Sequence, residues 1–196
     1  AHADLLSFCL AIDGSHWFVD RGTYSYTLRD ISYELRSGIA HNTIMVDGLD
    51  QMRIIGPFHS DGHASAGIIK YDGRGVKGEM RLAGAGTGIS ITRELRISEE
   101  GSRITFLDVI SGLSGQRVTW LLNLHPEVEV DRGGLLSRAG SNCRLQIFGL
   151  EGWVQRPVSY SPRYGVLENS LQLNCSVEAG GSTIIEREWS INISDN

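Results

Sequence analysis

Residues 117–130, RVTWLLNLHPEVEV, carry an apolar side chain at every second position. Pro126 interrupts the series, whose members are Val118, Trp120, Leu122, Leu124, Val128 and Val130. Successive side chains of a β-strand point to opposite faces, so this period of two residues indicates a strand that is buried on one side. Half-buried strands of this kind are typical of antiparallel sheets.

The same alternation returns along the chain. It is found in GISITRELRIS (88–98), SLQLNCSVE (170–178) and TIIEREWSINI (183–193). Turn dipeptides separate the apolar runs, and several are hairpin signals; they are Asp13-Gly14, Asp47-Gly48, Asp72-Gly73, Gly133-Gly134 and Gly180-Gly181.

No convincing helical period accompanies these strands. Residues 27–40, TLRDISYELRSGIA, come nearest, and they predict a single turn of helix or a loop. We find no internal repeat and no linker. The sequence therefore predicts an all-β fold, a large antiparallel β-sandwich of about a dozen strands, with residues 1–196 forming one domain.

Charge and composition exclude some functions. The net charge is −5 and the basic residues are scattered, which disfavours a nucleic-acid surface. No stretch approaches the roughly 18 apolar residues of a membrane-spanning helix. Only Lys70 and Lys77 among the 18 basic residues are lysines. Arginine suits carboxylates and sulfates, although a genome-wide codon preference explains the excess equally well.

The three cysteines indicate neither a disulfide framework nor a cysteine-type zinc site, because their number is odd and no CxxC spacing occurs. Cys9 and Cys175 lie in alternating apolar runs, so we expect both to be small core residues. Cys143 carries no motif.

Two of the six histidines are expected to have ordinary roles, and two more to lie in a loop. We expect His16, beside the Asp13-Gly14 turn, on the surface, and His125, at a strand end, in a structural role. His59 and His63 are expected in a surface loop, since their stretch does not read as a helix.

His2, Asp20 and His41 differ from the others. Two imidazoles and one carboxylate, with a fourth position open, are a donor set that zinc takes. A regular hairpin at Asp13-Gly14 would pair Asp20 with Ser7, however, about 16 Å along the strand from His2. The chain must bend, bulge or change register for the three to meet.

The same three residues fall in motifs that resemble a known family. HADLLSF (2–8), VDRGTYSY (19–26) and AHNTIMVDG (40–48) are similar to the GHxHxDxLSF, D-x-G-x-Y-x-Y and HNT motifs that open the C-terminal domain of heparinase II/III-like polysaccharide lyases. LNLHPEVEV (122–130) and YSPRYG (160–165) resemble later segments of that domain.

This resemblance implies a C-terminal β-sandwich preceded, in the whole protein, by an α/α toroid. It implies cleavage of an acidic polysaccharide by β-elimination, with heparin, heparan sulfate and alginate as candidate substrates. It assigns a metal, usually zinc, to His2, Asp20 and His41, and we expect Asp4 to orient one of these ligands. A periplasmic or secreted location is expected.

The resemblance also bears on where the chain begins. The first histidine of GHxH, which the family places at the catalytic cleft, would stand two residues before His2. We therefore expect that residue 1 is a cut inside this motif, that the main catalytic groups lie upstream, and that the domain alone is inactive.

Four residues between the ligands Asp20 and His41 are candidate substrate contacts: Tyr24, Tyr26, Arg29 and Arg36. An arginine would pair with a substrate carboxylate, and Tyr26 would stack on a sugar or donate a hydrogen bond. Core packing for the tyrosines and a solvated charge for the arginines remain open. We expect the metal to be structural rather than a Lewis acid at the reacting carboxylate.

Two other functional classes remain open. One is a non-catalytic carbohydrate-binding or structural β-sandwich in an envelope or exopolysaccharide pathway. The other is a cupin-like oxygenase, which would show a tighter His-x-His cluster followed by a glutamate. This chain lacks that cluster.

Overall fold

The structure, a computed structural model, describes residues 2–27, 30–62, 64–82 and 88–195. Within these ranges the chain forms short and long strands, one α-helix and one 3₁₀ helix. In order they are β1 (Leu10–Ile12), β2 (Ser15–Phe18), α1 (Asp30–Glu34), η1 (Gly38–Ala40), β3 (Ile44–Val46), β4 (Met52–Ile54), β5 (Ser60–Gly62), β6 (Ala64–Tyr71), β7 (Gly75–Leu82), β8 (Ile89–Ile97), β9 (Arg103–Ser111), β10 (Arg117–Asn123), β11 (Val128–Val130), β12 (Leu135–Arg138), β13 (Cys143–Phe148), β14 (Val154–Tyr160), β15 (Glu168–Glu178) and β16 (Ile184–Asp195).

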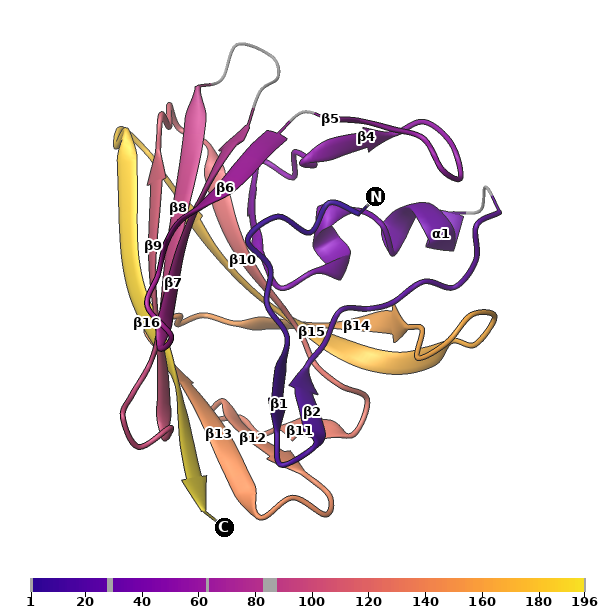
Figure 1. Ribbon diagram of the computed structural model, residues 1–196, viewed down its shortest axis with the longest axis vertical. Coiled ribbons are helices and arrows are strands. Elements are labelled where there is room, and N and C mark those ends of the chain that lie inside the picture. The colour runs from indigo at the N-terminus through magenta and orange to yellow at the C-terminus, as the bar shows by residue number, and fades with distance from the viewer. Residues whose placement is uncertain (1, 28–29, 63, 83–87, 196) are drawn as a thin grey trace.

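Two antiparallel sheets dominate this fold (Figure 1). The larger has eight strands in the order β11-β12-β13-β16-β9-β8-β7-β6, and the smaller has four in the order β14-β15-β10-β3. The pairs β1-β2 and β4-β5 form two separate ribbons. The predicted all-β antiparallel sandwich is confirmed. The described strands number 16 rather than about a dozen, because strands as short as β1 or β4, three residues each, are too short to show an alternation.

The core lies between these sheets and is built from the alternating positions. Trp120 on β10 and Phe106 and Trp189 on β9 and β16 are at most 1% exposed. Phe106 and Trp189 stack with ring centroids 3.9 Å apart. Cys175 is buried as expected, but Cys9 is exposed, which corrects the expectation that both cysteines belong to the core. Cys9 precedes β1, where the chain has left the regular alternation.

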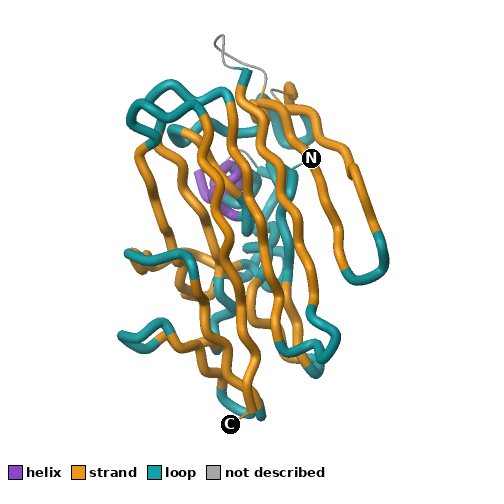
Figure 2. Tube along the Cα trace, turned by 90° about the vertical axis from the view of Figure 1, so that its left-hand side faces the viewer, coloured by secondary structure: helices purple, strands orange, loops and turns teal. Residues whose placement is uncertain are grey.

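The turn signals explain the hairpins. Asp13 and Gly14, between β1 and β2, have φ angles of 49° and 76°, the left-handed pair that a two-residue hairpin turn requires. Residues 27–40 hold α1 and η1, as the sequence predicted. β16 ends at the lower end of the long strands, whereas the N-terminal segment lies beside their upper half (Figure 2). No helix among the described residues is long and apolar enough to cross a bilayer.

Candidate metal centre

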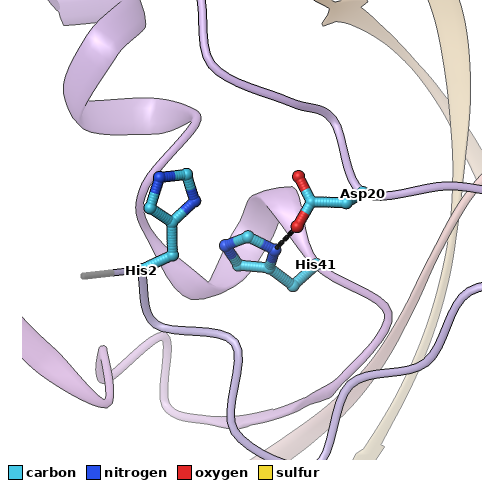
Figure 3. A group of neighbouring side chains, drawn as sticks. All are labelled: His2, Asp20 and His41. Carbon is cyan, nitrogen blue, oxygen red and sulfur yellow. Dashed lines mark ion pairs between the residues drawn. The ribbon is translucent and has the colours of Figure 1, made fainter. Parts of the chain in front are cut away.

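His2, Asp20 and His41 meet in one place. One possible ligand atom from each lies within 4.8 Å of those of the other two. The rings of His2 and His41 have centroids 5.5 Å apart. The side chains come from the N-terminal segment, from the loop behind β2 and from the residue behind η1, and they converge as Figure 3 shows. This grouping of His, Asp and His fits the sequence prediction.

A turn in the N-terminal segment, ahead of a bulged hairpin, brings His2 to this place. Leu10 pairs with Phe18 but Ala11 pairs with His16, so the β1-β2 ribbon carries a bulge between Leu10 and Ala11. Ahead of it the chain turns, where Leu6 has φ 57° and the Ser7 N–H donates to the Asp4 carbonyl at 3.1 Å. The bulge alone would place Asp20 opposite Phe8, six residues from His2. The turn at Leu6 and Ser7 is therefore what folds the chain back and brings His2 toward Asp20.

Hydrogen bonds then hold the N-terminal segment in position. The Ala3 N–H donates to the Arg36 carbonyl at 2.9 Å. The Leu5 N–H donates to Gln51 Oε1 at 2.8 Å, and Thr43 Oγ1 donates to the Leu5 carbonyl at 2.8 Å. Since Ala3 is also fully buried, His2 is anchored although it is close to the first residue.

Asp20 is fixed by the turn that follows it. Its Oδ1 accepts the Gly22 N–H at 2.7 Å, which leaves Oδ2 to face His41 Nδ1 at 2.8 Å. Gly22 has φ 80°, and a β-carbon there would lie 2.1 Å from the Ser161 carbonyl oxygen. The D-x-G motif therefore needs glycine both for its backbone conformation and for the close approach of Ser161.

Gly22→Ala should destabilise the protein more than Gly14→Ala. Both glycines have positive φ, 80° and 76°, but a β-carbon at Gly14 would meet nothing within 4 Å. We expect a loss of about 1 kcal/mol from backbone strain at Gly14. At Gly22 we expect about 3 kcal/mol or more, because the backbone of Ser161 must also move. Denaturant unfolding measures both variants. Equal losses would contradict the close packing of Gly22 on Ser161.

His41 has the environment of a ligand. Its side chain is 1% exposed. Its Nδ1 is close to Asp20 but poorly aligned for a hydrogen bond, and neither ring nitrogen has a hydrogen-bond partner among the described residues. A buried polar atom without a partner is costly. A zinc ion bound by one of these nitrogens would give that nitrogen a partner, so the residues present fit a metal.

The surroundings of His2 and Asp20 favour the protonation states that bind a metal ion. Burial, together with the nearby His41, lowers the pKa of His2, although Asp20 and Asp4 act in the opposite direction. Burial alone would raise the pKa of Asp20, but the adjoining His41 ring and the Gly22 N–H outweigh it and bring this pKa below its usual value. A neutral imidazole and an ionised carboxylate are the forms that bind metal.

The residue after His41 joins three segments. Asn42 Nδ2 donates to the carbonyls of Phe8 and Val19, at 2.7 and 3.1 Å, and its Oδ1 accepts the Asn123 N–H at 2.6 Å. Asn42 is 1% exposed. The asparagine of the HNT motif thus connects the chain behind His2, the strand that leads to Asp20 and the end of β10.

A buried ion pair supports the site from the core, and our sequence analysis did not identify it. Arg93 of β8 and Asp108 of β9 pair through Nε–Oδ1 at 2.7 Å and Nη2–Oδ2 at 3.0 Å. Asp108 Oδ2 also accepts the indole N–H groups of Trp120 and Trp189. Arg93 Nη1 donates to the carbonyls of Leu6 and Asn42, at 3.0 and 3.1 Å. Both residues belong to segments that carry a candidate ligand.

The other candidate site residues are more dispersed. Tyr24 is partly buried and Tyr26 is 47% exposed. Arg36 is 4% exposed and donates to the Gly56 carbonyl at 2.9 Å, so it holds a neighbouring loop. Asp4 is exposed in the turn behind His2, on which its charge acts through space. Arg29 lies outside the described residues.

The remaining histidines have the expected surroundings where they are described. His16 is exposed, and it stacks on the partly buried His125 with centroids 6.3 Å apart. The His125 N–H of the backbone donates to the Trp17 carbonyl, which agrees with a structural role. His59 is exposed in the loop between β4 and β5, and His63 lies outside the described residues.

Fold and site together define a class of protein, an antiparallel β-sandwich domain with a candidate two-histidine, one-aspartate metal centre. The chain belongs to the family described as heparinase II/III-like, C-terminal, whose sequence profile matches residues 1–188. A search of curated proteins found no match.

The solved structures of similar fold include a heparan sulfate lyase and heparinase III proteins. Heparan sulfate lyase HepC from Pedobacter heparinus superposes with a TM-score of 0.77 at 12% identity. The superposition covers 100% of this chain and 31% of the HepC chain. Heparinase III structures give TM-scores of 0.75 and 0.73 at 15% and 16% identity, over 100% of this chain and 31% and 30% of theirs. The chain thus spans about a third of these relatives.

Proposed function

We propose that this chain is the C-terminal domain of a polysaccharide lyase that cleaves an acidic, uronate-containing polysaccharide by β-elimination. In this proposal the sandwich forms one wall of the cleft and holds a structural zinc or another divalent cation. The convergence of His2, Asp20 and His41 inside a heparinase II/III-like domain is the observation that carries it.

The elimination makes three chemical demands. The uronate carboxylate must be neutralised so that the C5 proton becomes acidic, a base must remove that proton, and an acid must protonate the leaving glycosidic oxygen. We assign the base and the acid to a preceding domain of the same polypeptide, an α/α toroid. The sandwich contributes Tyr24 and Tyr26 as contacts that position the sugar beside the centre.

The metal would act on the protein rather than on the substrate. When bound, it would tie the N-terminal segment, the D-x-G turn and the HNT segment together through His2, Asp20 and His41. Asn42 and Arg93 already connect these segments, so the ion would complete an existing set of cross-links. Its loss should loosen the loop between residues 20 and 41. A secreted or periplasmic location agrees with a polymeric substrate.

A lyase assay on the full-length polypeptide tests this function. We expect an ultraviolet absorbance that grows with time on heparan sulfate, heparin or alginate, because β-elimination leaves an unsaturated uronate at the new end. Asp20→Asn should reduce the rate by about 10-fold or more if the metal centre shapes the cleft. Binding of all three polymers without any unsaturated product would refute the lyase and favour a non-catalytic carbohydrate-binding domain.

A further inference from the structure

Three aromatic rings lie side by side on the surface near the candidate centre. Phe58 and Tyr164 flank Tyr26, with ring centroids 5.1 and 6.0 Å from it and interplanar angles of 33° in both cases. They are 47% (Tyr26), 79% (Phe58) and 62% (Tyr164) exposed. We call these three residues the aromatic surface.

The rings come from three loops that the backbone holds together. Tyr26 follows the D-x-G turn, Phe58 belongs to the β4-β5 loop and Tyr164 to the β14-β15 loop. The Gly165 N–H donates to the Tyr24 carbonyl at 2.8 Å, and the Ser161 N–H donates to the Arg21 carbonyl at 2.8 Å. These bonds lay the loop of Tyr164 along the segment that carries Asp20.

Hydrogen bonds from the buried Arg36 and within the loop itself hold the loop of Phe58 in position. Arg36 Nη1 donates to the Gly56 carbonyl, and the Ile55 and Gly56 N–H groups both donate to the His59 carbonyl at 3.1 Å. Arg36 itself is 4% exposed. A ring that is 79% exposed therefore stands on a loop whose backbone is held by hydrogen bonds, so the loop presents the ring to solvent in a defined position.

The chemistry of this surface suits a charged sugar. Aromatic rings offer flat apolar faces that pack on the C–H groups of a pyranose, and the hydroxyls of Tyr26 and Tyr164 can donate to or accept from sugar hydroxyls. Arg163, the neighbour of Tyr164, is exposed and makes no ion pair with a described residue. A guanidinium on the residue next to a stacking ring would suit a carboxylate or a sulfate on the bound sugar.

We propose that Tyr26, Phe58 and Tyr164 form a stacking subsite for the acidic polysaccharide, with Arg163 as its anion contact. The inference rests on the proposed function and deepens it, because it assigns Phe58, Tyr164 and Arg163 to substrate binding. Tyr26 lies six residues beyond Asp20 in the segment that both sites share, so the subsite would bind sugar units of the same polymer chain that reaches the cleft.

Steady-state kinetics and binding of the full-length protein test this subsite, with heparan sulfate and alginate oligosaccharides of defined length as probes. Phe58→Ala and Tyr164→Ala should each weaken binding and raise KM by about 5-fold, and kcat should change less. Tyr164→Phe should retain most of the affinity, and Arg163→Gln should reduce the salt dependence of binding. Tyr71→Ala is the matched control, because Tyr71 is also an exposed aromatic residue, 75% exposed, but lies on β6 of the eight-stranded sheet and outside the aromatic surface.

Each outcome decides between separate claims. Wild-type affinity for the oligosaccharides in both alanine variants would overturn the subsite and leave the lyase function intact. Unchanged affinity with a lowered unfolding midpoint would instead make the aromatic surface a contact with another domain. A wild-type protein that neither binds nor cleaves any acidic polysaccharide would overturn the proposed function and the subsite together.

Discussion

Asp108→Ala should cost about 3–5 kcal/mol of folding free energy, because it leaves a buried charge without its counter-ion. Asp108 is fully buried and Arg93 is 6% exposed. The carboxylate accepts two hydrogen bonds from Arg93 and one from each of the indoles Trp120 and Trp189. Its removal orphans four donors at once, between the two sheets. Denaturant unfolding, or failure to obtain folded protein, measures the loss.

Two further variants keep this prediction falsifiable. Arg96→Ala removes an exposed partner of Glu94 on the same strand as Arg93, and we expect it to cost far less than Asp108→Ala, because solvent screens exposed ion pairs. The double replacement Arg93→Met with Asp108→Leu should recover part of the stability, since it removes both charges. A loss at Asp108 no larger than that at Arg96 would contradict the network.

Zinc should stabilise the wild-type protein and not His41→Ala. A ligand that binds only the folded state adds about 2.7 kcal/mol at a hundredfold excess over its dissociation constant. We therefore expect the unfolding midpoint of the full-length protein to rise by several degrees with zinc and to fall back with a chelator. In His41→Ala, which lacks the buried imidazole of the trio, the midpoint should not respond.

His16→Ala is the matched control for this measurement. His16 is exposed and lies outside the trio, so its loss should leave the response to zinc unchanged. A zinc response that persists in His41→Ala but disappears in His16→Ala would place the metal elsewhere on the chain.

The sheets were predictable because their strands are half-buried. In β10 the alternating residues Val118, Trp120 and Leu122 are buried, and the pattern is clear in the sequence although Leu121 and Asn123 are buried too. The three-residue strands were not predictable, because pairing partners rather than an alternation define them. Similarly, the turn at Leu6, whose φ is 57°, leaves no mark in the sequence, yet it brings His2 back toward Asp20.

The alternation of buried residues does contain a signal for the Arg93–Asp108 ion pair. Arg93 falls at the same parity as the buried Ile89 and Ile91, and Asp108 at that of Ile104 and Ile110. Opposite charges at inward positions of two successive strands are a signal for a buried pair. By contrast, the burial of Arg36 and the exposure of Phe58 depend on loop packing that no periodicity reports.

The metal content of the protein tests the central claim most directly. Full-length protein loaded with zinc and then dialysed against metal-free buffer should retain about one zinc per chain by elemental analysis. Asp20→Ala and His41→Ala, prepared alongside, should retain almost none, because each removes one of three ligands. A wild-type chain that retains no divalent metal, or variants that retain as much as the wild type, would contradict the assignment of His2, Asp20 and His41 as a metal centre.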